Sequence, residues 1–457
     1  MRHPAALALF LALVCLAQPG ALLAQQWPEP LPPEIQQLFE PTLTAIRAGH
    51  LVDPETGTTV ANQIILTRFN PSNGQSEIVD VGSNVTIPDG TEVIDLSNLY
   101  VLPGLVDSHD HLAITYKRIP ENNAYYFTTI MDSSPIRAIQ AFSNGFQKLA
   151  SGFTVVRDLG NNGNYADTAL RHAIEQGWVP GPTLINAGII IGAFGGQFFE
   201  VPEWENTVYP EYLNADTNDE IVKAIRRNIH YGAQVIKVCV DCQRYPYTVD
   251  QLKLFVSEAA NANMRVSGHV QTTEGARRAI EAGLWSLDHA NALTDELHKM
   301  MAEKSIYRAG TETPLTWYRG SERGFARTVE GLRNAYENGV KITFSTDADY
   351  YVPGLHRGEV TINFLKTWKA ADIPAPDILK AMTITGYEAC EIQEERGPIK
   401  KGLAADIIAV SENPLEDIDA LRDVQFVMKD GQVFKRDGVV MPMPFFHGGP
   451  QYGWRVR

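Results

Sequence analysis

The chain has 457 residues, of which 44% are hydrophobic and 20% are charged, and its formal net charge is −15 at pH 7. This is an ordinary globular composition, and the length indicates roughly two to three domains, although α/β barrels reach this size as one domain. The acidity argues against a nucleic-acid partner because no basic cluster offsets it, and its simplest interpretation is solubility.

Residues 1–24 have the pattern of a secretory signal peptide. Arg2 supplies a positive charge, an apolar run covers 5–16, Pro19-Gly20 follows, and Ala24 is the expected cleavage point. The apolar run is shorter than the roughly 20 residues of a membrane-spanning helix. We therefore expect a secreted or periplasmic protein with no stable membrane span.

The chain then changes character twice. Residues 25–40 are proline-rich and predict an extended linker. From 41 to 100, short β-like runs separated by turn signals predict the first part of a β-sandwich. From 101 to 395, strand-like runs alternate with helical ones, which is typical of βα units in a parallel sheet, and eight such units predict a closed barrel. The expected strands end near His109, Asp158, Ile190, Lys237, His269, His289, Thr311 and Asp347.

β-like runs return between 396 and 440 and predict the second part of the sandwich, paired with the first. The expected fold class is therefore α/β: a TIM-type (β/α)8 barrel with a small discontinuous β-sandwich domain from the N- and C-terminal segments. Residues 441–457 form a C-terminal tail without a usable period.

Six polar residues, each at or just past the end of a strand-like run, are the most informative feature of the chain. In chain order they are His109, His111, Lys237, His269, His289 and Asp347. Strand ends of a parallel barrel converge on the face that carries the chemistry. Imidazole and carboxylate groups are ligands for zinc, iron or manganese. Taken singly, each residue has a plainer structural interpretation, but together they indicate two divalent metal ions.

These residues and their flanks resemble the amidohydrolase superfamily, in the binuclear branch that includes imidazolonepropionase-like and Xaa-Pro dipeptidase-like enzymes. The matching flanks are 101–109 (VLPGLVDSH), 151–158 (SGFTVVRD) and 397–406 (GPIKKGLAAD). The resemblance extends from about residue 42 to about residue 437.

The resemblance implies a role for each of the six. Residues two apart on a strand point to the same side, so His109 and His111 can reach one ion, with Asp347 as its third ligand. His269 and His289 are similar to the ligands of the second ion, and zinc is the metal expected. An ammonium has no lone pair for a metal, so the resemblance implies a carbamate on Lys237. These six residues together make up the metal centre that the resemblance implies.

The same chemistry implies a mechanism. A metal-bridging hydroxide would attack an amide carbonyl, the second ion would hold the oxyanion, and Asp347 would be the catalytic residue that moves the proton to the leaving nitrogen. Asp107 and Asp288, which precede ligand histidines, either orient imidazoles or are ordinary strand-end polar residues. Cys239 and Cys242 form a Cys-x-x-Cys for which a disulfide, inert thiols, a redox pair and a metal motif are all open.

Substrate contacts are predicted from position alone. Arg157, at the end of a strand, is a candidate anchor for a substrate carboxylate, with structural pairing as the alternative. Tyr245 and Tyr247 follow Lys237, and His356 follows Asp347 over the expected mouth. Many relatives carry a histidine in the loop 192–199, where this chain has Gln197 and Phe198. An aromatic pocket would also involve the loop residues Trp204, Trp317 and Tyr318.

The expected function is a secreted amidohydrolase that cleaves a small-molecule amide: a dipeptide, an Xaa-Pro-like peptide or an N-acyl amino acid. One alternative is a hydrolase of cyclic amides or lactones that uses the same centre, since fold does not determine substrate. The other alternative is a barrel that binds a ligand without catalysis. It is disfavoured because all six predicted ligand positions are filled. The sequence leaves a homo-oligomer open.

Overall fold

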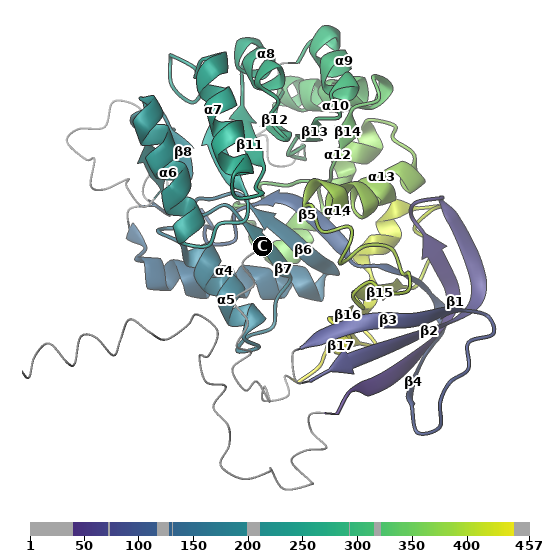
Figure 1. The fold of residues 1–457 in the computed structure, drawn as a ribbon. Helices are drawn as coiled ribbons and strands as arrows, with labels where there is room; N and C mark the ends of the chain where they lie inside the picture. Colours follow the sequence, from purple (N-terminus) through teal and green to yellow (C-terminus); the bar gives the residue numbers. More distant parts are fainter. Residues whose placement is uncertain are drawn as a thin grey trace, which may run out of the picture.

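The computed structural model describes residues 40–71, 74–116, 128–129, 131–198, 211–291, 293–314 and 321–442. The predicted signal peptide and nearly all of the linker and of the tail lie outside these residues. Figure 1 shows a ring of strands covered by helices, with a separate sheet beside it. Among the described residues, no helix combines the length and the apolar character that crossing a membrane requires.

The barrel is built from parallel strands whose apolar residues are almost all buried. In chain order the strands are β5 (Leu105–Asp110), β6 (Phe153–Asp158), β7 (Thr183–Asn186), β8 (Ile190–Gly192), β10 (Ile236–Cys239), β11 (Val266–Val270), β12 (Ser286–His289), β13 (Tyr307–Ala309) and β14 (Lys341–Ile342). β5, β6 and β7 pair in parallel in this order. A second parallel series runs through β8, β10, β11, β12, β13 and β14. All eight strand regions expected from the sequence are present.

The ring closes through backbone hydrogen bonds between strand ends. Ser108 N donates to Phe344 O at 2.9 Å, and Thr346 N donates to His109 O at 3.0 Å, which joins the first strand to the last. The third expected strand is divided, because Gly188 (φ +68°) interrupts it between β7 and β8. The first half pairs with β6, and the second pairs with β10 and with a short additional strand, β9 (Tyr212–Asn214).

Helices follow the strands, as in βα units. Their bounds are α4 (Ser134–Ala150), α5 (Ala166–Glu175), α6 (Asn218–His230), α7 (Val249–Ala260), α8 (Thr273–Ala282), α9 (Asp295–Glu303), α10 (Glu322–Glu337), α11 (Arg357–Ile362), α12 (Leu365–Ala370), α13 (Ala375–Ala381) and α14 (Ile384–Ala389). Several begin with a side-chain cap: Thr217 and Thr248 each form a capping box. Such caps satisfy first-turn amides and set where the helix begins.

The second body is one eight-stranded sheet in the order β18-β17-β16-β15-β4-β1-β2-β3. Its members are β1 (Thr42–Asp53), β2 (Thr58–Asn70), β3 (Gln75–Gly82), β4 (Glu92–Pro103), β15 (Ile407–Val410), β16 (Val424–Lys429), β17 (Gln432–Arg436) and β18 (Val439–Val440). Antiparallel pairing of β15 with β4 joins the C-terminal segment to the N-terminal one, as predicted.

The two ends of this sheet approach each other. Ile78 N donates to Leu403 O at 2.7 Å, and a side chain on Gly431 would meet Ser76. The sheet therefore folds over a shared apolar core, to which Ile46, Ile94 and Phe426 contribute without solvent exposure. β4 runs directly into β5, so this body anchors the barrel strand that carries His109 and leads to His111.

Candidate active site

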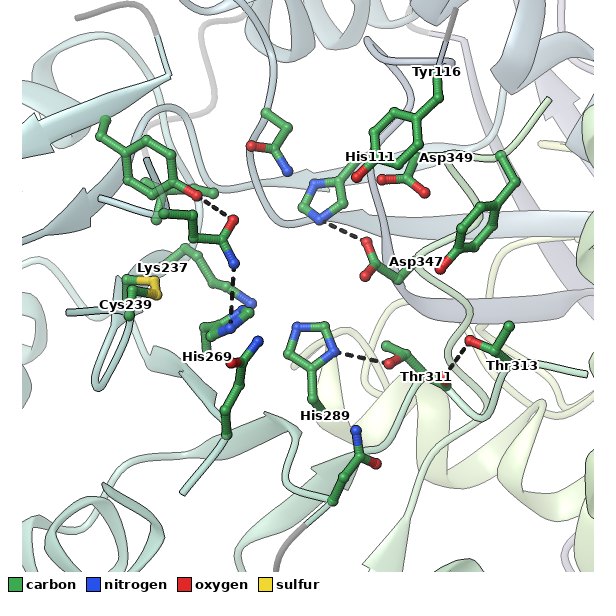
Figure 2. Close-up of a pocket in the computed structure, with 18 residues that line it drawn as sticks. His111, Tyr116, Lys237, Cys239, His269, His289, Thr311, Thr313, Asp347 and Asp349 are labelled. Atoms are coloured by element: carbon green, nitrogen blue, oxygen red, sulfur yellow. Dashed lines mark hydrogen bonds and ion pairs between the residues drawn. A yellow bond between two sulfur atoms is a disulfide. The ribbon is translucent and has the colours of Figure 1, made fainter. Parts of the chain in front are cut away.

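The carboxyl ends of the barrel strands surround a cavity of about 450 Å³. Figure 2 shows that the imidazoles of His111, His269 and His289 and the carboxylate of Asp347 face this common space. Five of the six residues predicted as ligands line it, and the sixth, His109, lies beneath it without solvent exposure. The barrel thus brings all six together, although they span 239 positions from His109 to Asp347 counted inclusively.

The first group consists of His109, His111 and Asp347. The Nε2 atoms of the two histidines are 3.2 Å apart, and Asp347 Oδ1 lies 3.0 Å from His111 Nε2 and 3.8 Å from His109 Nε2. Two imidazole nitrogens and a carboxylate oxygen therefore lie together at this point of the site. His289 also reaches it, since ligating atoms of His109, His289 and Asp347 lie within 4.8 Å of one another.

The second group consists of His269, His289 and Lys237. The rings of His269 and His289 are 4.3 Å apart between centroids. Lys237, 1% exposed, lines the cavity and ion-pairs with Asp288. As an unmodified amine it donates a hydrogen bond rather than an electron pair.

The backbone at three strand ends adopts a left-handed conformation that side chains rarely take. The φ angles are +62° at His289, +53° at Thr311 and +53° at Asp347. Such residues cost about 1–3 kcal/mol each and persist only where their surroundings hold them. Asp347 is held by the hydrogen bond from its own N–H to His109 O at 2.8 Å. Clustering of this strain at one cavity is typical of a functional site.

Burial keeps three of the four imidazoles neutral. Desolvation is the main cause that lowers the pKa of His109 to about 3, that of His289 to about 4, and that of His269 well below its usual value. A neutral imidazole has a free lone pair, which is the form that binds a metal. Burial also opposes the charge of His111, but the hydrogen bond and charge of Asp347 outweigh it and raise the pKa of His111 to about 9.

Each of three histidines is oriented by a partner at its other ring nitrogen. His111 Nδ1 donates to Gly160 O at 2.8 Å, which directs its Nε2 to the cavity. His289 Nδ1 lies 2.8 Å from Thr311 Oγ1, and His109 Nδ1 lies 3.4 Å from Asp288 Oδ1. Metal-binding histidines in proteins usually have such outer partners. The donor set and its orientation therefore fit divalent metal ions.

Asp107 and Asp288 support this set in different ways. Asp288 contacts the His109 ring and Lys237, and accepts a 2.7 Å hydrogen bond from Ser267, so it orients side chains of the site. Asp107 accepts hydrogen bonds from the backbone N–H of His109 and from Thr346, and pairs with Lys148. It therefore holds the first and last strands together rather than an imidazole.

The structure corrects the expectation that Arg157 binds substrate. Its side chain is 1% exposed and donates to Ser108 O at 2.6 Å and to Ser286 Oγ at 3.2 Å, and it approaches Ala389 O at 3.5 Å. Trp285, which precedes β12, also donates to Ala389 O, so this carbonyl lies at the amino end of the strands. Arg157 therefore extends inside the barrel away from the cavity and is occupied by protein groups.

The other three predicted contacts also lie away from this cavity. Tyr245 is 55% exposed, and its hydroxyl is 3.4 Å from Asp216. The buried Tyr247 donates to Ala215 O at 2.6 Å. His356 caps α11 and lines a separate hollow of about 440 Å³. Trp204, Trp317 and Tyr318, invoked for an aromatic pocket, are outside the described residues.

Apart from the predicted ligands, the described cavity wall is mainly amide, hydroxyl and phenol groups, and many of these were not predicted from the sequence. The added residues are Tyr116, Asn161, Tyr212, Gln271, Asn291, Thr313, Asp349 and Tyr350. Gln271, Asn291, Thr313 and Asp349 each follow an expected strand end by two residues, and that spacing was a usable signal. No feature of the sequence marked Tyr212, because its short strand β9 joins the barrel only by pairing with β8 in the folded chain.

Gln197 occupies the wall beside His269. Its Oε1 accepts a 2.5 Å hydrogen bond from Tyr212 Oη, and its Nε2 lies 3.3 Å from His269 Nε2. Gln243 donates to Gly196 O at 2.7 Å and holds the loop. The loop that follows the third strand thus places a neutral amide with a defined orientation beside His269.

Cys239 and Cys242 are joined in a disulfide, which is one of the four alternatives that the sequence left open. Both residues line the cavity, and Cys239 follows Lys237 by two positions on β10.

Comparison with known proteins agrees with this geometry. Residues 100–434 match the model of the "Amidohydrolase family". The chain is similar to ochratoxinase of Aspergillus niger, at 27% identity over 447 aligned positions that cover 88% of each chain. It is also similar to imidazolonepropionase of Clostridium tetani, at 24% identity, with 75% of this chain and 83% of the relative covered.

Among solved structures, a Xaa-Pro dipeptidase with methionine bound in its active site is 27% identical, with a TM-score of 0.74. The match covers 86% of this chain and 100% of that chain. A TM-score of 0.74 over this coverage shows that the two chains share the overall fold described above.

Proposed function

We propose, from the premise that this chain belongs to the amidohydrolase family, that it hydrolyses a small-molecule amide with two divalent metal ions. Hydrolysis of carbon–nitrogen bonds follows from the family and its relatives. The observation that carries the metal centre is the convergence of His109, His111 and Asp347, with His289 close to His109 and Asp347. Imidazole and carboxylate ligands favour zinc, as expected from the sequence.

In this proposal His109, His111 and Asp347 hold one ion, and His269 and His289 hold the other. The ions would supply a water of lowered pKa as nucleophile and an electrophile for the carbonyl oxygen. Asp347, whose Oδ1 lies 3.0 Å from His111 Nε2 beside the cavity, would be the base that accepts a proton and passes it to the leaving nitrogen. Asp288, whose Oδ1 lies 3.4 Å from His109 Nδ1, would hold the His109 ring in position.

Lys237 is proposed to bridge the ions as a carbamate. Burial lowers the pKa of its amine despite the nearby Asp288, so the neutral amine that reacts with carbon dioxide becomes more accessible. A carbamate would supply two oxygens and a negative charge between two cations. The expected signature is a mass increment on Lys237 in the native protein that acid treatment removes. Failure to detect it in fully active protein would overturn the bridge.

The proposed substrate is a dipeptide, an Xaa-Pro-like peptide or an N-acyl amino acid. The dipeptidase relative holds methionine, an amino acid, in its active site, which supports a substrate with an amino-acid portion. Arg157 is not available as an anchor, and within the described part of the wall no arginine is found. Amide and hydroxyl groups such as Asn291, Thr313 and Tyr116 would bind the substrate's polar groups instead.

Metal analysis combined with a substrate panel tests this function. Bound metals would be counted in the purified protein, which would then be assayed on dipeptides, N-acyl amino acids, cyclic amides and lactones, with and without chelator. About two ions per chain and chelator-sensitive cleavage of the linear amides are expected. Cleavage of lactones or cyclic amides alone would favour the alternative function. Metal binding without turnover of any compound would leave a non-catalytic barrel.

We also propose that residues 1–24 direct export and are removed. N-terminal sequencing of protein recovered outside the cytoplasm is expected to begin at Gln25. A native N-terminus that retains Met1 would contradict this.

A further inference from the structure

Two sulfur atoms and an imidazole meet in the wall of the cavity. β10 carries Lys237 and Cys239 on the same side, two residues apart, and Cys239 pairs in register with His269 of β11. The chain then turns back, so Cys242 lies with its Cα 5.6 Å from the Cα of Cys239. Figure 2 shows the disulfide beside Lys237 and His269. The disulfide is therefore part of the cavity wall rather than a distant staple.

The three groups are close enough to share one metal ion. The ligating atoms of Cys239, Cys242 and His269 all lie within 4.8 Å of one another. Cys239 is 2% exposed and His269 is 7% exposed, and both cysteines line the cavity. The mechanism proposed above uses His269 and assigns nothing to either cysteine.

We propose that reduction of the Cys239–Cys242 disulfide creates an additional metal site, in which both sulfurs and His269 bind a thiophilic divalent cation. The site itself rests on this geometry alone. Its consequence for activity rests on the proposed function, because His269 would be withdrawn from the catalytic ions.

The chemistry of the switch is balanced. Two equivalents of a thiol reductant become one disulfide, and the cystine bond is replaced by two cysteine thiols. A divalent cation then displaces two protons to water, forming two metal–sulfur bonds and one bond to the His269 nitrogen. Two thiolates neutralise the cation, so the buried wall gains no net charge.

The ligand set selects the ion. Thiolate and imidazole ligands favour soft or borderline metals such as Cd²⁺ and Zn²⁺ over Mg²⁺ or Ca²⁺. The set has three protein ligands, which leaves the fourth tetrahedral position open to the cavity. In the oxidised protein neither sulfur is a thiolate, and His269 remains available, together with His289, to the proposed catalytic ion.

Cadmium titration of the full chain tests the proposal. Protein loaded with its own metals would be titrated with Cd²⁺, before and after treatment with a thiol reductant that is then removed under argon. Ultraviolet absorption would report cadmium–thiolate charge transfer, and metal analysis would report stoichiometry. The reduced protein is expected to take up about one further ion per chain with the thiolate band, and to lose its hydrolytic activity. The oxidised protein is expected to show no band.

Single-site variants separate this site from other thiols. Cys239→Ser and Cys242→Ser should each abolish the band and the dependence of bound cadmium on reduction. Cys390→Ser removes the buried free cysteine of the barrel, outside the cavity, and should behave as the native chain does. Because Cys239→Ser also lacks the disulfide, its melting temperature shows whether the fold tolerates that loss.

The outcomes distinguish the two proposals. A reduced native chain without the thiolate band, or a band that survives Cys242→Ser, would overturn the additional site. A band without any change in activity would uphold the site and remove His269 from the catalytic centre. Absence of hydrolysis in the oxidised, metal-loaded protein would count against the proposed function alone, since the band is read without substrate.

Discussion

The barrel mouth and the interior of the eight-stranded sheet are stabilised in opposite ways. At the mouth, Lys237 and Asp288 form a buried ion pair, and His289 and Asp347 adopt left-handed backbone conformations. In the sheet, side chains such as Ile407 are fully buried among other apolar groups. Strain and buried charge are tolerated at functional sites at a cost in stability, while apolar packing offsets that cost elsewhere. Substitutions in the two regions should therefore separate activity from stability.

The largest effect is expected from Asp347→Asn. Loss of the carboxylate removes a proposed ligand and the proton carrier, and proton transfer of this kind contributes roughly 10²–10⁴-fold to rate. Asparagine tolerates the left-handed backbone, so the melting temperature should change little. The measurement is kcat/KM beside a thermal melt. Asp372→Asn is the matched control, because Asp372 has φ +56° and is ion-paired with Arg333 on the surface.

Ile407→Ala should affect the other region alone. Ile407 is fully buried in β15, and removing such a side chain costs about 2–5 kcal/mol in the free energy of unfolding. Denaturant unfolding would measure the loss, and kcat/KM of the folded fraction should be unchanged. Val60→Ala, at a half-exposed position of β2, should cost far less. Equal costs for the two variants would contradict the core described for this sheet.

Asp288→Asn tests how much the mouth depends on its buried charges. The substitution weakens the contact to the His109 ring and the ion pair with Lys237. Outer partners of metal ligands typically contribute 10–100-fold to affinity or activity. We expect a loss in that range in metal affinity, measured by competition with a coloured chelator. Unchanged affinity would show that Asp288 is structural only.

Tyr212→Phe should give a smaller effect on substrate binding. The hydroxyl is expected to hold the Gln197 amide, and a hydrogen bond of this kind contributes about 0.5–1.5 kcal/mol. We expect KM to increase by the factor that corresponds to this free energy, with kcat nearly unchanged. Tyr307→Phe, whose hydroxyl donates to Glu388 away from the cavity, is the control. A change in kcat alone would place the pair in the chemical step instead.

Tyr245→Phe should have the smallest effect of all. The Tyr245 hydroxyl is exposed and only 3.4 Å from Asp216, outside the described cavity wall. Neither kcat/KM nor the melting temperature should change measurably. A clear increase in KM would restore Tyr245 as a substrate contact and show that its loop moves on binding.

The convergence of strand ends in a parallel barrel explains why the six predicted ligand positions lie together, but it could not predict the orientation of Arg157. The sequence pattern locates where each strand ends, and closure of the barrel then brings the ends together. It does not determine which way a side chain at the end points. Arg157 turns toward Ser286 and Ala389 inside the barrel, where their oxygens accept hydrogen bonds from its Nη1. The cavity wall was missed for a related reason: residues such as Tyr212 enter it through pairing that involves distant strands.

Hydrophobic periods and short flanking motifs encode the family, the barrel with its divided β domain, and the order of the polar strand ends locally along the chain. The remaining features arise only in the folded molecule. Folding directed Gln197 toward His269 and placed His289 and Asp347 in left-handed conformations. These features depend on contacts between residues far apart in the chain, and such contacts exist only once the barrel has closed.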